Sequence, residues 1–190
     1  MQRKSSKANA NFCDSPTSYG WTSIVLHWLG AVAIILLWFI GRSIGSADPD
    51  DVVNTRGLHV SAGMTVWLLL VYRTVRRFRN PHPHVAGLGH GMFRIARGAH
   101  YLMLVLLAAM LMSGPLLLWS AALPVTLFGS IDWAGSGTVH PAVLTVASAV
   151  HRTSASALAI LVILHVAGAL KHLMFHDDDT FVAMLRPNRR

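Results

Sequence analysis

The chain has 190 residues, of which 53% are hydrophobic and 13% are charged, and its mean hydropathy is +0.48. The charged share is about half of that in typical soluble proteins, so the composition indicates a membrane protein. Basic residues give a formal net charge of +8, which by itself would also suit a protein that binds nucleic acid. Their positions beside apolar segments argue against nucleic acid as a partner.

Four apolar segments follow one another along the chain: Ile24 to Ile44, Leu58 to Val75, Ile95 to Ser120 and Val143 to Phe175. Each is long enough for a helix to cross a hydrocarbon layer about 30 Å thick. A helix satisfies its own backbone polar groups in lipid, and the alternating pattern of a membrane barrel is absent. The sequence therefore predicts an all-α bundle of four transmembrane helices. We expect residues 21–186 to form this domain, after a flexible cytoplasmic tail (1–20) and before a short basic end (187–190).

Basic residues are unevenly divided between the two sides of the predicted membrane. One side holds Arg3, Lys4, Lys7, Arg73, Arg76, Arg77, Arg79, Arg94, Arg97, Lys171, Arg186, Arg189 and Arg190. The other side holds Arg42, Arg56 and Arg152, offset by Asp48, Asp50, Asp51 and Asp132. Because cytoplasmic loops carry the excess of Lys and Arg, both termini are predicted to be cytoplasmic.

Four histidines interrupt the apolar segments, where ionisable side chains are costly and usually functional. His151 and His165 are fourteen residues apart in the last segment, so in a helix they share a face and lie about 21 Å apart along its axis. The first two helices run in opposite directions, which places His27 near the cytoplasmic side and His59 near the periplasmic side. His165 then matches the depth of His27, and His151 matches that of His59.

Paired imidazoles that project from facing helices can fill both axial positions of a haem iron. Zinc instead prefers four ligands, usually with thiolate or carboxylate among them. A small residue lies about one turn from each histidine and would leave room for a flat macrocycle: Gly30, Gly63, Ala155 and Gly168. Helix packing is the ordinary alternative for a single histidine, whereas four at matched depths favour two haem sites.

The chain resembles the bacterial di-haem cytochrome b561 family over roughly Tyr19 to Arg186. The resemblance depends on four pieces in this order: "LHWLG", "LHVSAGMTVWLLLVYR", "HRTSASALAILVILHVAGALKH" and "DDDTFVAMLRP". It implies a bundle in the inner membrane with two non-covalent haem b groups held between helices one, two and four. It also implies electron exchange with a quinone. The ligand positions of the family match His27, His59, His151 and His165 in this sequence.

Two features depart from this resemblance. Relatives often end the last helix with Lys-His-His, whereas this chain reads "LKHLMFH" and keeps Lys171 and His172 before a leucine. Some relatives are reported to oxidise superoxide at the periplasmic face, where a positive funnel would steer the anion. The first periplasmic connection of this chain is instead rich in Asp.

Several other polar residues near the cytoplasmic side are candidates for contact with a cofactor or quinone. Lys171 and His172 could deliver a proton to a quinone, the alternative being a pair that snorkels to the interface. His100 could contact the inner haem or a quinone, or serve only in packing. Haem propionates could bind arginines, although membrane orientation explains the same residues equally well: Arg73, Arg94 and Arg97.

The predicted function is transmembrane electron transfer by a bis-histidine di-haem b cytochrome, with ubiquinone or another quinone as redox partner and an unknown donor or acceptor at the periplasmic side. Three alternatives stay open at this point. They are a haem-bearing membrane anchor for a soluble dehydrogenase or hydrogenase, a superoxide:ubiquinone oxidoreductase, and a non-redox transporter or channel. The direction of electron flow, the haem potentials and the oligomeric state, including a homo-oligomer, also stay open.

Overall fold

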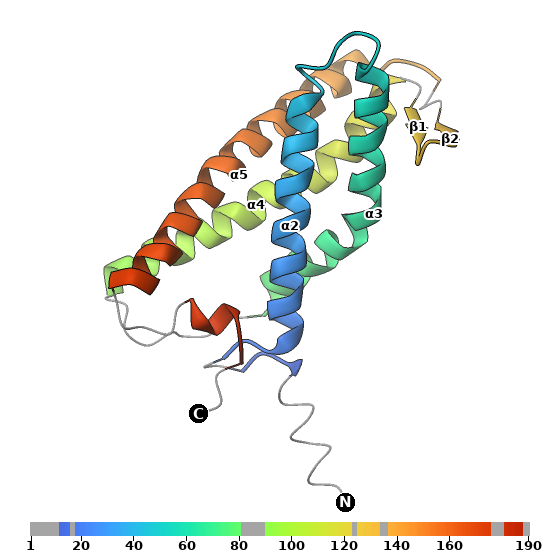
Figure 1. Ribbon diagram of the computed structural model, residues 1–190. Coiled ribbons are helices and arrows are strands. Elements are labelled where there is room, and N and C mark those ends of the chain that lie inside the picture. Colours follow the sequence, from blue (N-terminus) through green and yellow to red (C-terminus); the bar gives the residue numbers. More distant parts are fainter. Residues whose placement is uncertain are drawn as a thin grey trace, which may run out of the picture.

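Four long helices make up most of the computed structural model (Figure 1), which describes residues 12–15, 18–80, 90–122, 125–133, 137–175 and 181–187. The helices are α2 (Trp21–Ser43), α3 (Val52–Arg79), α4 (His90–Ala121) and α5 (Pro141–Phe175). Each contains a stretch long and apolar enough to cross a membrane. The predicted all-α fold with four membrane-spanning helices is confirmed, and the chain is a multi-pass membrane protein.

The helices extend beyond the apolar segments at several ends. α3 begins at Val52 and continues through three arginines in its last turn, Arg76, Arg77 and Arg79. Cations there complement the negative end of the helix dipole, so the basic cluster also stabilises the helix that it ends. α5 begins at Pro141, where the fixed backbone angle of proline suits the first helical position.

The helices form two antiparallel pairs, α2 with α3 and α4 with α5, and the pairs meet mainly through α3 and α4. α2 and α5 are not among the closely packed helix pairs. We call the end with the α2–α3 connection the loop end, and the end where α2 begins and α5 ends the termini end. In Figure 1 the α4–α5 pair is inclined to the α2–α3 pair.

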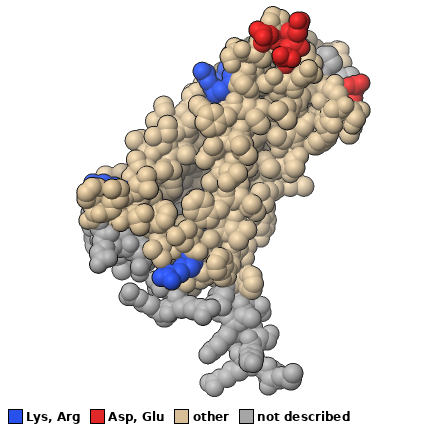
Figure 2. Space-filling view, viewed as in Figure 1, with Lys and Arg blue, Asp and Glu red and all other residues tan. Residues whose placement is uncertain are grey.

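Charge is concentrated at the ends of the bundle. Figure 2 shows acidic side chains gathered at the loop end, over the α2–α3 connection, and a wide band between the two ends of this face that is almost free of charge. Large apolar side chains are exposed along the helices, among them Leu68, Ile163 and Leu164, each more than half exposed. Such a band suits contact with lipid tails rather than water.

A small β-hairpin, which the sequence reading did not predict, follows α4 at the loop end. Strands β1 (Val125–Leu127) and β2 (Ile131–Trp133) pair antiparallel, with Phe128 and Gly129 at positive φ in the turn. The hairpin lies on the first turns of α3, where the Phe128 N–H donates to Ser61 Oγ at 2.8 Å. A Cβ on Gly57 would lie 2.8 Å from the Thr126 carbonyl oxygen, so only glycine permits this close approach.

The segment before α2 is held to the termini end of the bundle by Asp14. Its carboxylate accepts from the Gly20 N–H at 2.8 Å and from the Ser23 hydroxyl at 2.7 Å, and lies 3.6 Å from Arg77. Arg77 also donates to the Tyr19 hydroxyl at 2.9 Å. Burial raises the pKa of Tyr19, so its phenol stays neutral and serves as an acceptor. These contacts join the chain before α2 to the end of α3.

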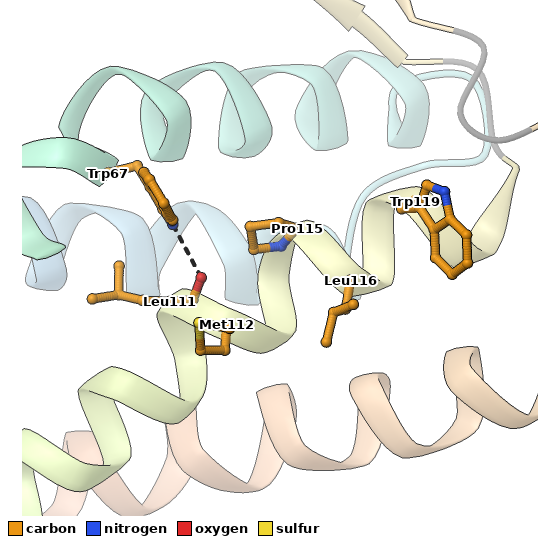
Figure 3. A pocket seen from close by; sticks show the side chains of 6 residues that line it. All are labelled: Trp67, Leu111, Met112, Pro115, Leu116 and Trp119. Atoms are coloured by element: carbon orange, nitrogen blue, oxygen red, sulfur yellow. Dashed lines mark hydrogen bonds between the residues drawn. The ribbon is translucent and has the colours of Figure 1, made fainter.

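Pro115 interrupts the hydrogen bonds of α4, and Trp67 of α3 compensates for the loss. Proline has no N–H, so Pro115 leaves the Leu111 carbonyl without its usual helical donor. The Trp67 Nε1–H donates to this oxygen at 3.0 Å (Figure 3). Trp67 and Pro115 line an apolar pocket of about 310 Å³ between α3 and α4, together with Leu111, Met112, Leu116 and Trp119.

Trp67→Phe should lower the free energy of unfolding by about 1–2 kcal/mol, because it leaves the Leu111 carbonyl unsatisfied inside the membrane. Pro115→Ala restores a helical N–H for that oxygen, so Trp67→Phe should cost much less in this background. A double-mutant cycle of unfolding in mild detergent measures the difference and cancels the lost packing of the indole. Equal losses in both backgrounds would show that the hydrogen bond has no role in stability.

Candidate functional site

Two histidines, one from α2 and one from α5, face each other toward the termini end. His27 lies near the start of α2, and His165 lies in the second half of α5. Their ring centres are 6.3 Å apart with an interplanar angle of 62°. We call them the termini-end pair.

A second pair of histidines lies toward the loop end. His59 is near the start of α3 and His151 is in the first half of α5, with ring centres 6.4 Å apart and an interplanar angle of 89°. The His59 ring lies against the backbone of α2 at Gly41, where an added Cβ would come within 3.0 Å of its Cε1. These residues form the loop-end pair. The structure thus brings the four histidines together in the combination that their depths predict.

Both separations would leave room for a metal ion between the two rings. A ligating nitrogen lies about 2.0 Å from a metal and about 1.15 Å from its own ring centre, so rings on opposite sides of one ion have centres roughly 6.3 Å apart. The directly hydrogen-bonded rings of His100 and His165 are closer, at 5.1 Å. The rings of the two pairs are therefore farther apart than hydrogen-bonded rings, at a separation that would leave room for a metal ion between them.

The Nδ1 atoms of both α5 histidines face α4. His165 Nδ1 lies 3.3 Å from His100 Nε2, and His151 Nδ1 lies 3.2 Å from Ser113 Oγ. Hydrogen bonding through one ring nitrogen leaves the other available to a metal. In both α5 histidines the available nitrogen is Nε2.

The Nδ1 atom of His59 is buried and has no hydrogen-bond partner among the described residues, although the Leu37 carbonyl lies nearby. Buried polar atoms are normally paired. The surroundings of His59 therefore differ from those of the α5 histidines, because its ring lies against α2 at Gly41 and near the Leu37 carbonyl rather than against a polar side chain of α4.

Arg73 of α3 reaches across α2 to His27, and its Nη2 lies 3.3 Å from His27 Nδ1. A Cβ on Gly30 would lie 2.8 Å from the Arg73 Cδ, so glycine gives the side chain its path. A guanidinium only donates, which makes His27 Nδ1 the acceptor and leaves the proton of the neutral ring on Nε2. Binding of a metal through Nε2 would leave the ring proton on Nδ1. Arg73, which also donates toward Nδ1, would then have to move away from it.

Comparison of the sequence with known proteins shows its family. Residues 18–187 match the family model described as prokaryotic cytochrome b561. The chain belongs to the prokaryotic cytochrome b561 family. It is also similar to cytochrome b561 homolog 2 of Escherichia coli (strain K12), with 29% identity over 178 residues that cover 92% of this chain and 95% of the relative. The protein is accordingly a membrane b-type cytochrome of electron transfer, and the family implies b-type haem.

The remaining candidates in this cytochrome b561 differ in their placement. Arg94 is exposed, and Arg97 is exposed with its guanidinium 5.7 Å from the centre of the Tyr101 ring. Arg73 is the arginine that contacts a histidine of the pairs. On the last turns of α5, Lys171 is exposed and His172 is half-buried.

Two contacts near the site were missed by the sequence reading. Ser113 gave no signal except its position, thirteen residues after His100 in α4. Trp28 donates its indole N–H to the Met184 carbonyl at 2.7 Å. This bond holds the 3-10 helix η1 (Val182–Met184) beside the termini-end pair, because Trp28 follows His27. No sequence periodicity could have linked residues so distant in the chain.

Proposed function

We propose that this cytochrome b561 transfers electrons across the bacterial inner membrane and exchanges them with the quinone pool. The observation that supports this function is the presence of two facing histidine pairs with ring centres 6.3 and 6.4 Å apart, at two depths of a membrane-spanning bundle. Two haem b groups, when bound, would supply reversible one-electron chemistry.

The termini-end and loop-end pairs would each provide two axial ligands. Protein side chains would then fill both axial positions, which favours outer-sphere electron transfer over binding of oxygen or substrate at the metal. α5 contributes to both pairs, and its histidines are about 21 Å apart along the helix axis. Arg73, once released from His27, would be available to pair bidentately with a haem carboxylate.

The orientation follows from charge. Arg76, Arg77 and Arg79 lie at the termini end in the last turn of α3, whereas Asp48, Asp50 and Asp51 lie at the loop end, where Figure 2 shows acidic side chains. The positive-inside rule then assigns the termini end to the cytoplasm. The acidic loop end would repel superoxide, which makes a superoxide-oxidising activity there the less supported function.

Quinone chemistry is assigned to the termini end. Reduction of a quinone requires protons as well as electrons, and His172 lies seven residues beyond His165 in α5, which is close to two turns on the same helix face. In this proposal the His172 imidazole transfers a proton to the quinone oxygen, and the Lys171 ammonium group stabilises negative charge that develops there. Both residues are proposed as catalytic.

Purified protein should contain two haem b groups per chain, extractable by acid acetone, because each histidine pair supplies both axial ligands of one iron. Haem quantification against protein concentration measures the ratio, and an optical spectrum identifies the haem type. A ratio near one would mean that one histidine pair has another role. A colourless protein would contradict the proposed function altogether.

The same preparation tests whether the chain acts by itself. Addition of a reduced quinol to the isolated protein should reduce its haems without any other subunit. If reduction required a co-purifying soluble dehydrogenase or hydrogenase, the chain would instead be a membrane anchor of that enzyme.

A further inference from the structure

We propose that α4, which supplies none of the four proposed ligands, positions both ligands of α5: His100 orients His165, and Ser113 orients His151. The inference rests on the proposed bis-histidine di-haem function. It assigns to His100 and Ser113 a positioning role that tunes each iron separately.

The two contacts have the same construction. His100 Nε2 lies 3.3 Å from His165 Nδ1, with the rings at 70°, and Ser113 Oγ lies 3.2 Å from His151 Nδ1. α4 and α5 are the most closely packed helix pair in the described structure. They run antiparallel, and the spacing of thirteen residues in α4 nearly equals that of fourteen in α5. Each α5 histidine therefore meets a polar side chain of α4 at its own depth, and His151 also lies near the Met110 carbonyl.

The chemistry of the two partners fits this role. A histidine that binds a metal through Nε2 carries its proton on Nδ1 and needs an acceptor there. Ser113 Oγ can accept a hydrogen bond from Nδ1 of His151 while its own hydroxyl donates to the Met110 carbonyl at 3.4 Å. His100 can accept through Nε2 when its own proton is on Nδ1. In both cases the contact fixes the tautomer as well as the direction of the ring.

The other two proposed ligands have no side-chain acceptor of this kind among the described residues, although the Leu37 carbonyl lies near the His59 ring. His59 Nδ1 has no hydrogen-bond partner there, and His27 Nδ1 faces the donor Arg73. His100 itself is not a third ligand, because no three His, Cys or Asp residues of the described chain form a group suited to one metal ion. Among the described residues, orientation by an acceptor side chain of a neighbouring helix is thus a property of the α4–α5 pair.

An acceptor at Nδ1 makes the imidazole a stronger electron donor to the metal, which stabilises the ferric state. Loss of the acceptor should therefore raise the reduction potential of the iron that the histidine binds. It should also weaken haem binding at that site, by about 10–100-fold according to the effect of comparable partners in other metal sites.

The test uses the full-length, haem-loaded protein, four variants of the two α4 residues and one control variant. His100→Leu removes the acceptor from His165, and His100→Gln keeps an amide oxygen that can accept. Ser113→Ala and Ser113→Thr form the equivalent couple for His151. Ser120→Ala is the matched control, because Ser120 is a buried serine of α4 that donates to the Leu117 carbonyl and contacts neither histidine pair.

Spectroelectrochemical titration and low-temperature electron paramagnetic resonance resolve the two haems. We expect His100→Leu to raise the potential and change the resonance of the termini-end haem alone, and His100→Gln to restore both. Ser113→Ala should do the same to the loop-end haem, with rescue by Ser113→Thr, while Ser120→Ala leaves both unchanged. Loss of haem in His100→Leu with retention in His100→Gln would also support the proposal.

An unchanged termini-end haem in His100→Leu, or equal shifts of both haems in either loss variant, would overturn the positioning role. These outcomes leave the proposed function intact, since the wild-type protein still contains two haems. A wild-type protein without two bis-histidine haems would overturn both proposals, so the wild-type spectrum separates the two failures.

Discussion

Replacement of His27 or His165 by alanine is expected to remove the same haem, and replacement of His59 or His151 is expected to remove the other. Each single variant should keep about half of the wild-type haem, because non-covalent haem is lost when one of its two axial ligands is removed. The physical reason is the pairing of the rings across the bundle, at 6.3 Å in one pair and 6.4 Å in the other. Haem quantification and the spectral component that disappears are the measurements.

Double variants test directly which histidines hold the same haem. His27→Ala combined with His165→Ala should lose no more haem than either single variant, since both remove the same group. His27→Ala combined with His59→Ala should lose both haems. His140→Ala is the control, because His140 stacks on Trp119 at the loop end, with ring centres 4.4 Å apart, and belongs to neither pair. Loss of the same spectral component in His27→Ala and His59→Ala would contradict the pairing.

The sequence was sufficient for the membrane helices because lipid allows few backbone structures. The sequence was also sufficient to predict which histidines lie opposite each other, since the depth of a residue in the membrane follows from helix direction and rise. His151 and His165 lie on one helix, so the distance between them needs no tertiary information. The depths of His27 and His59 required only that consecutive helices alternate in direction.

The contacts between helices could not be predicted because they depend on rotation and axial shift, which apolar periodicity leaves open. The bond from Trp67 to the Leu111 carbonyl is an example: Pro115 predicts the orphaned carbonyl, but no pattern indicates which residue of α3 reaches it. The hairpin was missed for another reason. Its strands have three residues each, which is too short for alternation to be recognised.

Arg73 shows in one residue what the sequence can indicate and what only the packing of the helices determines. The sequence explained it equally well by membrane orientation and by binding of a haem carboxylate. In the structure its guanidinium lies 3.3 Å from His27 Nδ1, over a glycine of α2 whose absent side chain gives it room. Only the packing of α2 on α3 distinguishes Arg73 from Arg94 and Arg97.

His172→Leu is expected to retain both haems and to slow electron exchange with quinol by about 100-fold, the scale of a lost general acid or base. Haem is retained because His172 belongs to neither histidine pair. Its loss affects quinol because oxidation of a quinol, like reduction of a quinone, transfers protons together with electrons. Stopped-flow reduction of the haems by quinol measures the rate, and haem quantification shows that the site is still loaded.

His140→Leu provides the matched control at the opposite end of α5, since it removes a non-ligand imidazole with the same change in side chain. If quinone reacts at the termini end, His172→Leu is slow and His140→Leu keeps the wild-type rate. Unchanged kinetics in a fully haem-loaded His172→Leu protein would exclude His172 as the group that exchanges a proton with the quinol. Slow kinetics in His140→Leu, Arg56→Gln or Arg152→Gln instead would move the quinone to the loop end, because these three residues lie there and the orientation of the bundle would then place quinone chemistry at the periplasmic face.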